Sequence, residues 1–216
     1  MNTQFHEDVS IPAGKVTVKG ELIIPAKANA IIIFSHGSGS SRFSKRNQRV
    51  AQYLHEKNFG TLLFDLLTEE EDKYYYNRFN IDLLTKRLAD ATEWLEKLPA
   101  AKDCRIGYFG ASTGAASALQ AAAQLSEIGG VVSRGGRPEL AMDYLENVEA
   151  PTLLIVGGQD IEVIELNKQA FKKLHCIKEL TIVEGATHLF EEEGMMDKVA
   201  KLASAWFEKY LYRTKV

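Results

Sequence analysis

One serine in the sequence lies in a setting that favours a nucleophile. Ser112 is the central residue of GASTG at 110–114, which fits the pattern G-x-S-x-G. In a nucleophile elbow of this pattern, a strand turns sharply into a helix and exposes a serine whose backbone is strained. The apolar run 105–109 precedes the motif and an alanine-rich stretch follows it. The motif therefore predicts attack on a carbonyl carbon by Ser112. The alternative is a glycine-rich turn in which the serine only caps the helix.

A serine hydroxyl is a poor nucleophile at neutral pH, so this chemistry needs a base and an acid that orients it. His188, in GATH at 185–188, follows the last apolar run and is the best placed of the five histidines. Asp160 closes GGQD at 157–160, just past an earlier apolar run. We expect Asp160 to orient the imidazole of His188. The alternative is that Asp160 caps the helix after it.

Other residues are weaker candidates for the same roles. Asp143 is an alternative acid, but its surroundings read as the middle of a helix. Asp65 ends an earlier strand and precedes the serine, so we interpret it as structural. Three further histidines are interpreted as surface or packing residues: His6, His55 and His175. Ser112, Asp160 and His188 therefore form the expected catalytic set.

The negative oxygen that forms during such an attack needs two backbone N–H donors. One is expected from Thr113, the residue after the nucleophile. The loop SHGSGSS at 35–41 follows the third strand and is expected to supply the second donor, the amide of Ser38. Glycines in this loop permit a close backbone approach, and His36 is expected to brace it.

Two groups of side chains are candidates for contacting a substrate. Arg134 and Arg137 in SRGGRPE follow the sixth strand and could pair with an anionic substrate, or simply be solvated. Arg42, Lys45 and Arg46 are further possible anion contacts. These basic residues suggest the hypothesis that the protein prefers an acidic substrate.

Aromatic residues in the segment 68–79 form the second group. Tyr75 and Tyr76, with Tyr74 and Phe79, follow the fourth strand. Loops at the carboxyl ends of parallel strands line the crevice in open α/β sheets. These aromatics could therefore wall the substrate, or they could pack on the body of the protein.

Short apolar runs alternate with amphipathic stretches along the chain. The expected strands are 6–11, 15–24, 30–34, 61–67, 105–109, 130–132, 152–156 and 179–183. The expected helices are 47–57, 81–98, 112–125, 165–174 and 195–211. Uninterrupted apolar strands indicate a parallel sheet covered by helices on both faces. This predicts a three-layer α/β sandwich around a mostly parallel eight-stranded sheet, with an N-terminal antiparallel hairpin joined by a short Pro-Ala-Gly turn.

Length and composition limit the remaining possibilities. At 216 residues, the chain 1–216 is expected to form a single domain, because chains usually divide beyond ~250–300 residues. Hydrophobic residues make up 45% of the chain, which excludes a disordered protein. Only a short helix fits the interval 133–149, so no large lid is expected.

Charge and residue types also restrict the partners. Lys and Arg number 26 against 29 Asp and Glu, for a net charge of −3, so nucleic acid is not an expected partner. No apolar run reaches the ~18–20 residues of a membrane span, and no secretory signal is visible, so we expect a cytoplasmic protein.

No Cys/His cluster suggests a metal, and no cofactor is expected. Oligomeric state is not indicated by the sequence.

Four motifs together resemble the α/β-hydrolase superfamily, and most closely its dienelactone hydrolase-like branch. They are HGSGSS at 36–41, GASTG at 110–114, GGQD at 157–160 and GATHLF at 185–190. The order Ser112, Asp160, His188 is also that of α/β-hydrolases. Dienelactone hydrolases proper use a cysteine nucleophile, whereas this elbow carries Ser112. The resemblance therefore implies a serine esterase acting on small or medium esters through an acyl-enzyme.

Two other functions are compatible with the same motifs. The same three residues could transfer acyl groups to alcohols or cleave thioesters or amides, which the sequence does not separate. A protein of this fold could also bind a small ligand without catalysis. Such proteins usually lose one of the three residues, and this chain retains all three.

Overall fold

The computed structural model describes residues 3–212, and residues 1–2 and 213–216 lie outside the description. The strands are β1 (Thr3–Ala13), β2 (Val16–Pro25), β3 (Ala30–Ser35), β4 (Gly60–Phe64), β5 (Arg105–Ala111), β6 (Ile128–Arg134), β7 (Thr152–Gly157) and β8 (Lys178–Val183). The α-helices are α1 (Lys45–Glu56), α2 (Glu69–Asp72), α3 (Ile81–Glu96), α4 (Thr113–Gln124), α5 (Ile161–Lys173) and α6 (Met195–Leu211). Three 3₁₀ helices are η1 (Tyr75–Phe79), η2 (Pro99–Ala101) and η3 (Pro138–Asn147).

The strands form one sheet in the order β1-β2-β4-β3-β5-β6-β7-β8. β1 pairs antiparallel with β2, and β2 pairs antiparallel with β4. Every other neighbouring pair is parallel. The hairpin therefore lies at one edge of the sheet, and the predicted fold class is confirmed.

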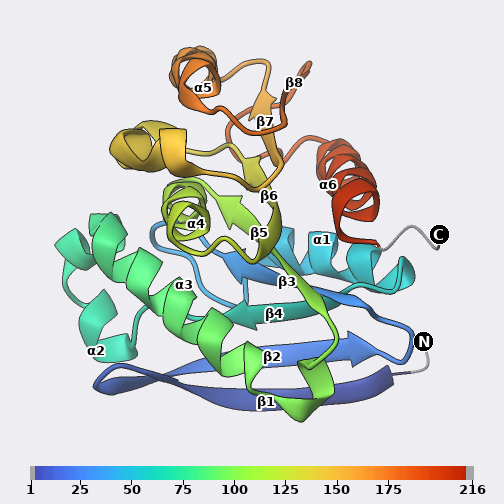
Figure 1. Cartoon of the computed structure of the whole chain (residues 1–216). Helices are drawn as coiled ribbons and strands as arrows, with labels where there is room; N and C mark the ends of the chain where they lie inside the picture. The colour runs from blue at the N-terminus through green and yellow to red at the C-terminus, as the bar shows by residue number, and fades with distance from the viewer. Residues whose placement is uncertain (1–2, 213–216) are drawn as a thin grey trace.

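Helices cover both faces of the sheet, with α3, α4 and α5 on one side and α1 and α6 on the other (Figure 1). Successive strand side chains point to opposite faces, so a fully apolar strand packs on both layers. In β3, Ile31 and Ile33 belong to the core cluster that contains the buried residues of α3 and α4. Ile32 and Phe34 belong to the cluster that contains those of α1 and α6. This is why the third strand reads as an unbroken apolar run.

Several element boundaries differ from the predicted ones. The hairpin turn is at Gly14 and Lys15, because Pro12 and Ala13 are still paired within β1. β4 ends at Phe64, so Asp65 lies beyond the strand. α5 begins at Ile161 rather than at residue 165, and Asp160 occupies its N-cap position.

The two segments that follow β4 and β6 contain only short helices. The segment after β4 folds as α2 and η1, and α2 starts with a capping box in which the Thr68 and Glu71 side chains each bond the other's backbone amide. The short helix expected after β6 is the 3₁₀ helix η3, which is kinked at Ala141. None of the helices in residues 3–212 has both the length and the hydrophobicity required to span a bilayer.

The parallel strands bring the expected functional loops to one edge of the sheet. β3 ends at Ser35, β5 at Ala111, β7 at Gly157 and β8 at Val183. Neighbouring parallel strands end at the same side, so the loops that follow these four strands lie together. This edge carries all the residues expected to act at Ser112.

Candidate active site

Ser112 lies between β5 and α4 with φ 52° and ψ −121°, a conformation rarely adopted by residues with a side chain. Its side chain makes no hydrogen bond to the helix, so it does not act as a cap. The amide of Ser112 donates to the carbonyl oxygen of Arg134 (3.2 Å), and its carbonyl accepts from the amides of Ala115 (3.0 Å) and Arg137 (3.1 Å). The strained serine is thus held by the helix that follows it and by the end of β6.

The glycines on either side of Ser112 are required by close backbone packing. A Cβ at Gly114 would lie 2.1 Å from the carbonyl oxygen of Ser35. A Cβ at Gly110 would lie 2.5 Å from the Cα of Ala115. Real Cβ atoms do not approach other atoms this closely, so both positions need glycine. The motif therefore forms a sharp strand–helix turn with a half-buried serine rather than a generic glycine-rich loop.

Asp160 and His188 are joined by a hydrogen bond of 2.6 Å from Nδ1 of the imidazole to Oδ2 of the carboxylate. Asp160 is at the N-cap position of α5, but its side chain makes no capping hydrogen bond. A Cβ at Gly157 would lie 2.5 Å from the carbonyl oxygens of Ala186 and Thr187, so this glycine lets the two loops approach. The sequence left two roles open for Asp160, helix capping or orientation of His188. Its side chain contacts His188 and does not cap the helix.

Ser112 and His188 line the same cavity, which has a volume of about 250 Å³. In the described part of the chain no hydrogen bond joins the Ser112 hydroxyl to His188. The other walls come from the loop after β3, the first turn of α1 and the ends of β5 and β6. The cavity is thus where the serine, the histidine and a bound molecule could meet.

The two expected oxyanion donors lie on adjacent segments and are coupled to each other. Thr113 is the first residue of α4, where helix amides have no acceptor within the helix. The amide of Ser38 donates to the Thr113 hydroxyl at 2.8 Å. A Cβ on Gly37 would lie 3.1 Å from the Ser112 Cβ, so the β3 loop rests directly against the serine.

His36 braces this loop through both ring nitrogens. Nε2 accepts a hydrogen bond from the amide of Leu66 at 3.1 Å, and Nδ1 donates to the carbonyl of Gly37 at 3.0 Å. Burial lowers the pKa of His36 below its ordinary value of 6.5. His36 therefore links the loops after β3 and β4 and has no ring nitrogen free to act as a base.

The alternative acids are occupied elsewhere. Asp65 accepts hydrogen bonds from the backbone amide and the guanidinium of Arg42. Asp143 lies on η3 and is exposed. Neither residue lines the cavity that Ser112 and His188 share. Arg42, which the sequence offered as an anion contact, is instead the ion-pair partner of Asp65.

Two of the arginines expected to contact an anion, Arg134 and Arg46, line the cavity. Three other expected contacts do not. Arg134 lines it and is 3% exposed. Arg137 is outside the cavity lining, and its guanidinium pairs with Glu139. Tyr75 and Tyr76 are also outside the lining and are 69% and 67% exposed. The aromatic wall expected over the substrate is therefore not formed by these tyrosines.

The conformation of the segment after β4 explains this correction. The Asn77 side chain donates to the carbonyl of Glu71 at 2.8 Å, and Arg78 forms an ion pair with Asp72. These contacts fold α2 and η1 against each other. The tyrosines of η1 are left on the solvent side, so they neither wall the cavity nor pack on the body.

Sequence reasoning missed Ser44 and Asn47, which also line the cavity. Ser44 is the N-cap of α1, and its hydroxyl accepts from the amide of Asn47. The expected helix began at residue 47, which hid the first turn. A serine three residues before Asn47 was the available signal.

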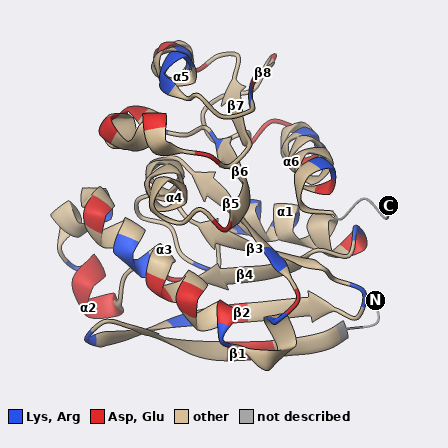
Figure 2. Ribbon diagram, in the orientation of Figure 1, with Lys and Arg blue, Asp and Glu red and all other residues tan. Residues whose placement is uncertain are grey.

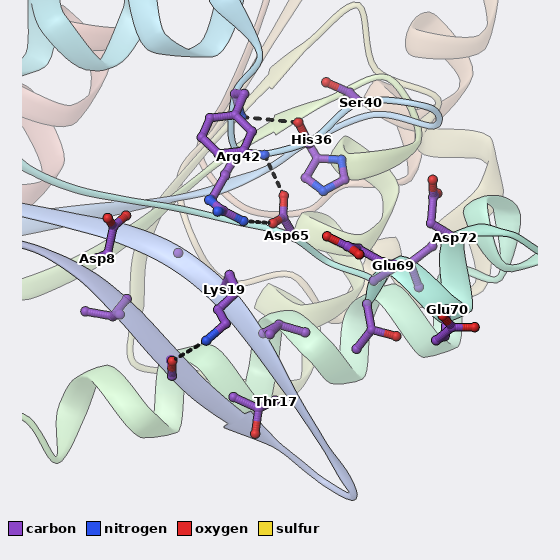
Figure 3. Close-up of a pocket in the computed structure, with 18 residues that line it drawn as sticks. Asp8, Thr17, Lys19, His36, Ser40, Arg42, Asp65, Glu69, Glu70 and Asp72 are labelled. Carbon is purple, nitrogen blue, oxygen red and sulfur yellow. Dashed lines mark hydrogen bonds and ion pairs between the residues drawn. The ribbon is translucent and has the colours of Figure 1, made fainter.

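A larger hollow of about 940 Å³ lies beside the cavity, between the β1–β2 hairpin and the loops after β3 and β4 (Figure 3). Ser40 lines both spaces. Most charged residues of the hollow are acidic, namely Asp8, Asp65, Glu69, Glu70 and Asp72, against Lys19 and Arg42. The acidic ribbon of α2 is visible in Figure 2. Neither Ser112 nor His188 lines this hollow, so it is separate from the nucleophile.

A mostly parallel eight-stranded sheet with a serine elbow after β5, an acid after β7 and a histidine after β8 defines an α/β-hydrolase fold. The chain belongs to the dienelactone hydrolase family, whose family model matches residues 18–213. The crystal structure of dienelactone hydrolase from Anabaena variabilis ATCC 29413 has 49% sequence identity and a TM-score of 0.94. The match covers 98% of this chain and 100% of that one.

Two further comparisons extend the picture. Est1E from Butyrivibrio proteoclasticus shares the fold, with a TM-score of 0.77 at 15% identity, covering 94% of this chain and 98% of that chain. Two Mycobacterium tuberculosis proteins, from strains CDC 1551 and H37Rv, carry the name "Putative phosphoribosyl transferase". Each is 53% identical over 206 residues, covering 95% of this chain and 46% of the relative. The chain thus spans just under half the length of these two proteins.

Proposed function

We propose that this protein is a serine esterase that hydrolyses small carboxylic esters through an acyl-enzyme intermediate. Ser112 is the nucleophile, His188 the general base and acid, and Asp160 the residue that orients the imidazole. The observation that carries the proposal is the 2.6 Å hydrogen bond between His188 and Asp160, next to a strained Ser112 that lines the same cavity as His188. Membership of the dienelactone hydrolase family supports hydrolase chemistry on this fold.

The first half-reaction forms the acyl-enzyme. Ser112 Oγ attacks the ester carbonyl while Nε2 of His188 takes its proton, and the carboxylate of Asp160 stabilises the imidazolium. Nδ1 of the histidine already donates to Asp160, which leaves Nε2 as the nitrogen that can accept this proton. The tetrahedral intermediate then expels the alcohol, which receives the proton from His188.

The negative oxygen of the intermediate is stabilised by the amides of Thr113 and Ser38. The Ser38 amide is bonded to the Thr113 hydroxyl in the resting protein, so it must be shared with the substrate oxygen or redirected to it. In the second half-reaction, His188 activates a water that attacks the acyl-enzyme. The products are the free acid and regenerated Ser112.

The test uses small 4-nitrophenyl esters and a fluorophosphonate probe that labels activated serines. Wild-type protein should hydrolyse the esters and become labelled, whereas Ser112→Ala should lose both properties with an unchanged circular-dichroism spectrum. Ser126→Ala is the control, because Ser126 is an exposed serine outside the cavity lining. Labelling and turnover that persist in Ser112→Ala would refute the assignment. An unlabelled, inactive wild type would favour a protein that binds a ligand without catalysis.

The name carried by the two mycobacterial relatives leads to no second proposal. It describes proteins more than twice as long as the part that matches this chain. The residues gathered at Ser112 support acyl chemistry. Transfer of the acyl group to an alcohol or a thiol would use the same three residues, and product analysis with added acceptor alcohols distinguishes it from hydrolysis.

A further inference from the structure

The cavity beside Ser112 is lined by positively charged and hydrogen-bonding groups and by no acidic side chain of residues 3–212. Arg134 and Arg46 both contribute to its walls, together with His188. The adjoining hollow has the opposite character, with five carboxylates. Arg46 also pairs with Glu191, and His188 pairs with Asp160. Within residues 3–212, Arg134 is thus the cation of this cavity that has no acidic partner.

Arg134 is the most informative residue of this cavity. Its side chain is 3% exposed. No ion pair or hydrogen bond joins the guanidinium of Arg134 to another of residues 3–212. Its Nε is buried without a partner, and the closest aromatic contact is the ring of Phe190, 5.9 Å from the guanidinium carbon. Burial, together with the positive charge of Arg46, lowers the pKa of Arg134 to about 10, so it is still a cation at neutral pH. A buried, unpaired cation is costly, and a bound anion would remove this cost.

The opposite wall is the N-terminal turn of α1. Ser44 caps this 12-residue helix, and its first turn contains no acidic side chain that would neutralise the helix dipole. Asn47 is 2% exposed, and its side-chain carbonyl is buried without a partner. Arg46 has an unpartnered Nε, while its Nη1 donates to the exposed Glu191 at 2.8 Å. Among the described residues, the unpartnered groups on this wall are thus one donor, Nε of Arg46, and one acceptor, Oδ1 of Asn47. An anion would be bound by Nε of Arg46 and by the amide nitrogen of Asn47, not by its oxygen.

The number and type of these groups favour a tetrahedral oxyanion over a carboxylate. Two guanidinium groups, a side-chain amide, serine hydroxyls and a helix N-terminus surround the cavity. A carboxylate has two oxygens, whereas a phosphate monoester presents three and carries about −1.5 to −2 charges at neutral pH. Helix N-termini and arginine forks are the usual protein partners of phosphate.

We infer that Arg134, Arg46, Asn47 and the N-terminus of α1 form a phosphate-binding subsite beside Ser112, and that the substrate is a small ester that also carries a phosphate group. The inference rests on the proposed esterase function and specifies its substrate class. The volume of about 250 Å³ limits the substrate to a short acyl chain and a short linker to the phosphate. Hydrolysis adds one water across the ester bond and releases the acid and a phosphorylated alcohol.

A matched series of three acetates tests this inference. They are 2-phosphoethyl acetate, 2-carboxyethyl acetate and 2-hydroxyethyl acetate, which share the scissile bond and differ in the terminal group. We expect kcat/KM of the wild type to be highest for the phosphate ester, by about 10-fold or more over the hydroxyl ester. Equal turnover of all three, or turnover of the carboxylate ester as fast as the phosphate ester, would overturn the inference.

Variants then identify the residue responsible. Arg134→Met should raise KM for 2-phosphoethyl acetate by about 10- to 100-fold and leave 2-hydroxyethyl acetate within about 3-fold. Arg134→Lys should recover part of the loss because it keeps the charge. Arg49→Met is the matched control, since Arg49 is an exposed arginine of α1 that pairs with Asp197 outside the cavity. An equal loss on both esters in Arg134→Met would show that Arg134 only supports the structure.

A binding measurement separates failure of this inference from failure of the esterase proposal. Inorganic phosphate should raise the melting temperature of wild type and Arg49→Met at constant ionic strength, and have a much smaller effect on Arg134→Met. If Arg134→Met does not fold, Arg46→Met replaces it. Phosphate binding that depends on Arg134 in a protein without esterase activity would retain the subsite and refute the esterase. Ester hydrolysis that depends on Ser112, without phosphate binding, would retain the esterase and refute the phosphate subsite.

Discussion

The backbone amide of Ser38 donates a hydrogen bond of 2.8 Å to the side-chain hydroxyl of Thr113. These residues are 75 positions apart in the chain, on the loop after β3 and at the first position of α4. Thr113 is 2% exposed, whereas Ser38 lies on an exposed loop, so the bond is partly buried. The bond joins the two segments expected to supply the oxyanion donors, so the position of one donor depends on the other.

Thr113→Val should weaken this connection. Valine has nearly the same shape but no acceptor, so the Ser38 amide loses its partner and the loop its link to α4. We expect the free energy of unfolding to fall by about 1–2 kcal/mol and esterase turnover to fall with it. Urea denaturation measures the stability change. Thr113→Ser keeps the hydroxyl and should stay close to wild type; an equal loss in both variants would indicate that the methyl group matters rather than the bond.

Gly114→Ala should disrupt the elbow itself. The new methyl group would lie 2.1 Å from the carbonyl oxygen of Ser35, a backbone atom that cannot move independently. We expect a loss of about 3 kcal/mol or more, because overpacking against backbone is poorly relieved. Gly130→Ala is the control, since its methyl group would make ordinary contacts at 3.8–4.0 Å. Similar melting temperatures for the two variants would contradict the steric argument.

Asp160→Asn should affect turnover far more than stability. An amide keeps the shape of the side chain but cannot stabilise the protonated imidazole of His188. By the general behaviour of such triads, kcat should fall by about three to four orders of magnitude. Asp143→Asn is the matched control, because Asp143 is the exposed alternative acid on η3. A large loss of kcat in Asp143→Asn with none in Asp160→Asn would reverse the assignment.

The free energy of unfolding should fall in mild acid because of His55. Its Nε2 lies 2.7 Å from the Thr61 hydroxyl in a buried contact, and burial lowers the pKa of His55 from 6.5 to about 4. The unfolded chain therefore takes up this proton at a higher pH than the folded protein. The free energy of unfolding should decline as pH falls from about 6.5 to about 4, by up to about 1.4 kcal/mol per pH unit for one proton.

Denaturation curves of wild type and His55→Gln across this range test the prediction. Glutamine retains a hydrogen-bonding group near Thr61 but does not titrate, so the slope should be shallower in the variant. The pKa of His36 is also lowered by burial, so a smaller slope of the same sign should remain. Superimposable slopes in the two proteins would exclude His55 as a source of the acid sensitivity.

Tyr75→Ser and Tyr76→Ser should leave KM for small esters within about 2-fold, since exposed side chains outside a site rarely matter. Both tyrosines are more than half exposed and absent from the lining of the Ser112 cavity. Steady-state kinetics with the three acetates measures the effect. A rise in KM comparable to that of Arg134→Met would place these tyrosines near the substrate after all.

Much of the fold follows from local sequence pattern. The fully apolar run of β3 indicated a strand covered on both faces, and the alternation of strands and helices indicated the parallel sheet. The motif GASTG at 110–114 was also readable, because the sharp turn leaves no room for a Cβ at positions 110 and 114. The chain order of Ser112, Asp160 and His188 was likewise readable, because it is the order found in α/β-hydrolases.

What lies opposite each residue was decided only by the tertiary structure. Asp160 had two equally local interpretations, and the loop that brings His188 within 2.6 Å, 28 residues later, selected one of them. Arg134 and Arg137 looked alike in SRGGRPE, yet the first is buried in the cavity and the second pairs with Glu139. Periodicity indicates which face a side chain occupies, but its partner depends on the packing of segments far apart in the chain. The sequence by itself therefore determined the fold and the order of the expected catalytic residues, and the tertiary structure decided which charges remain unpaired beside Ser112.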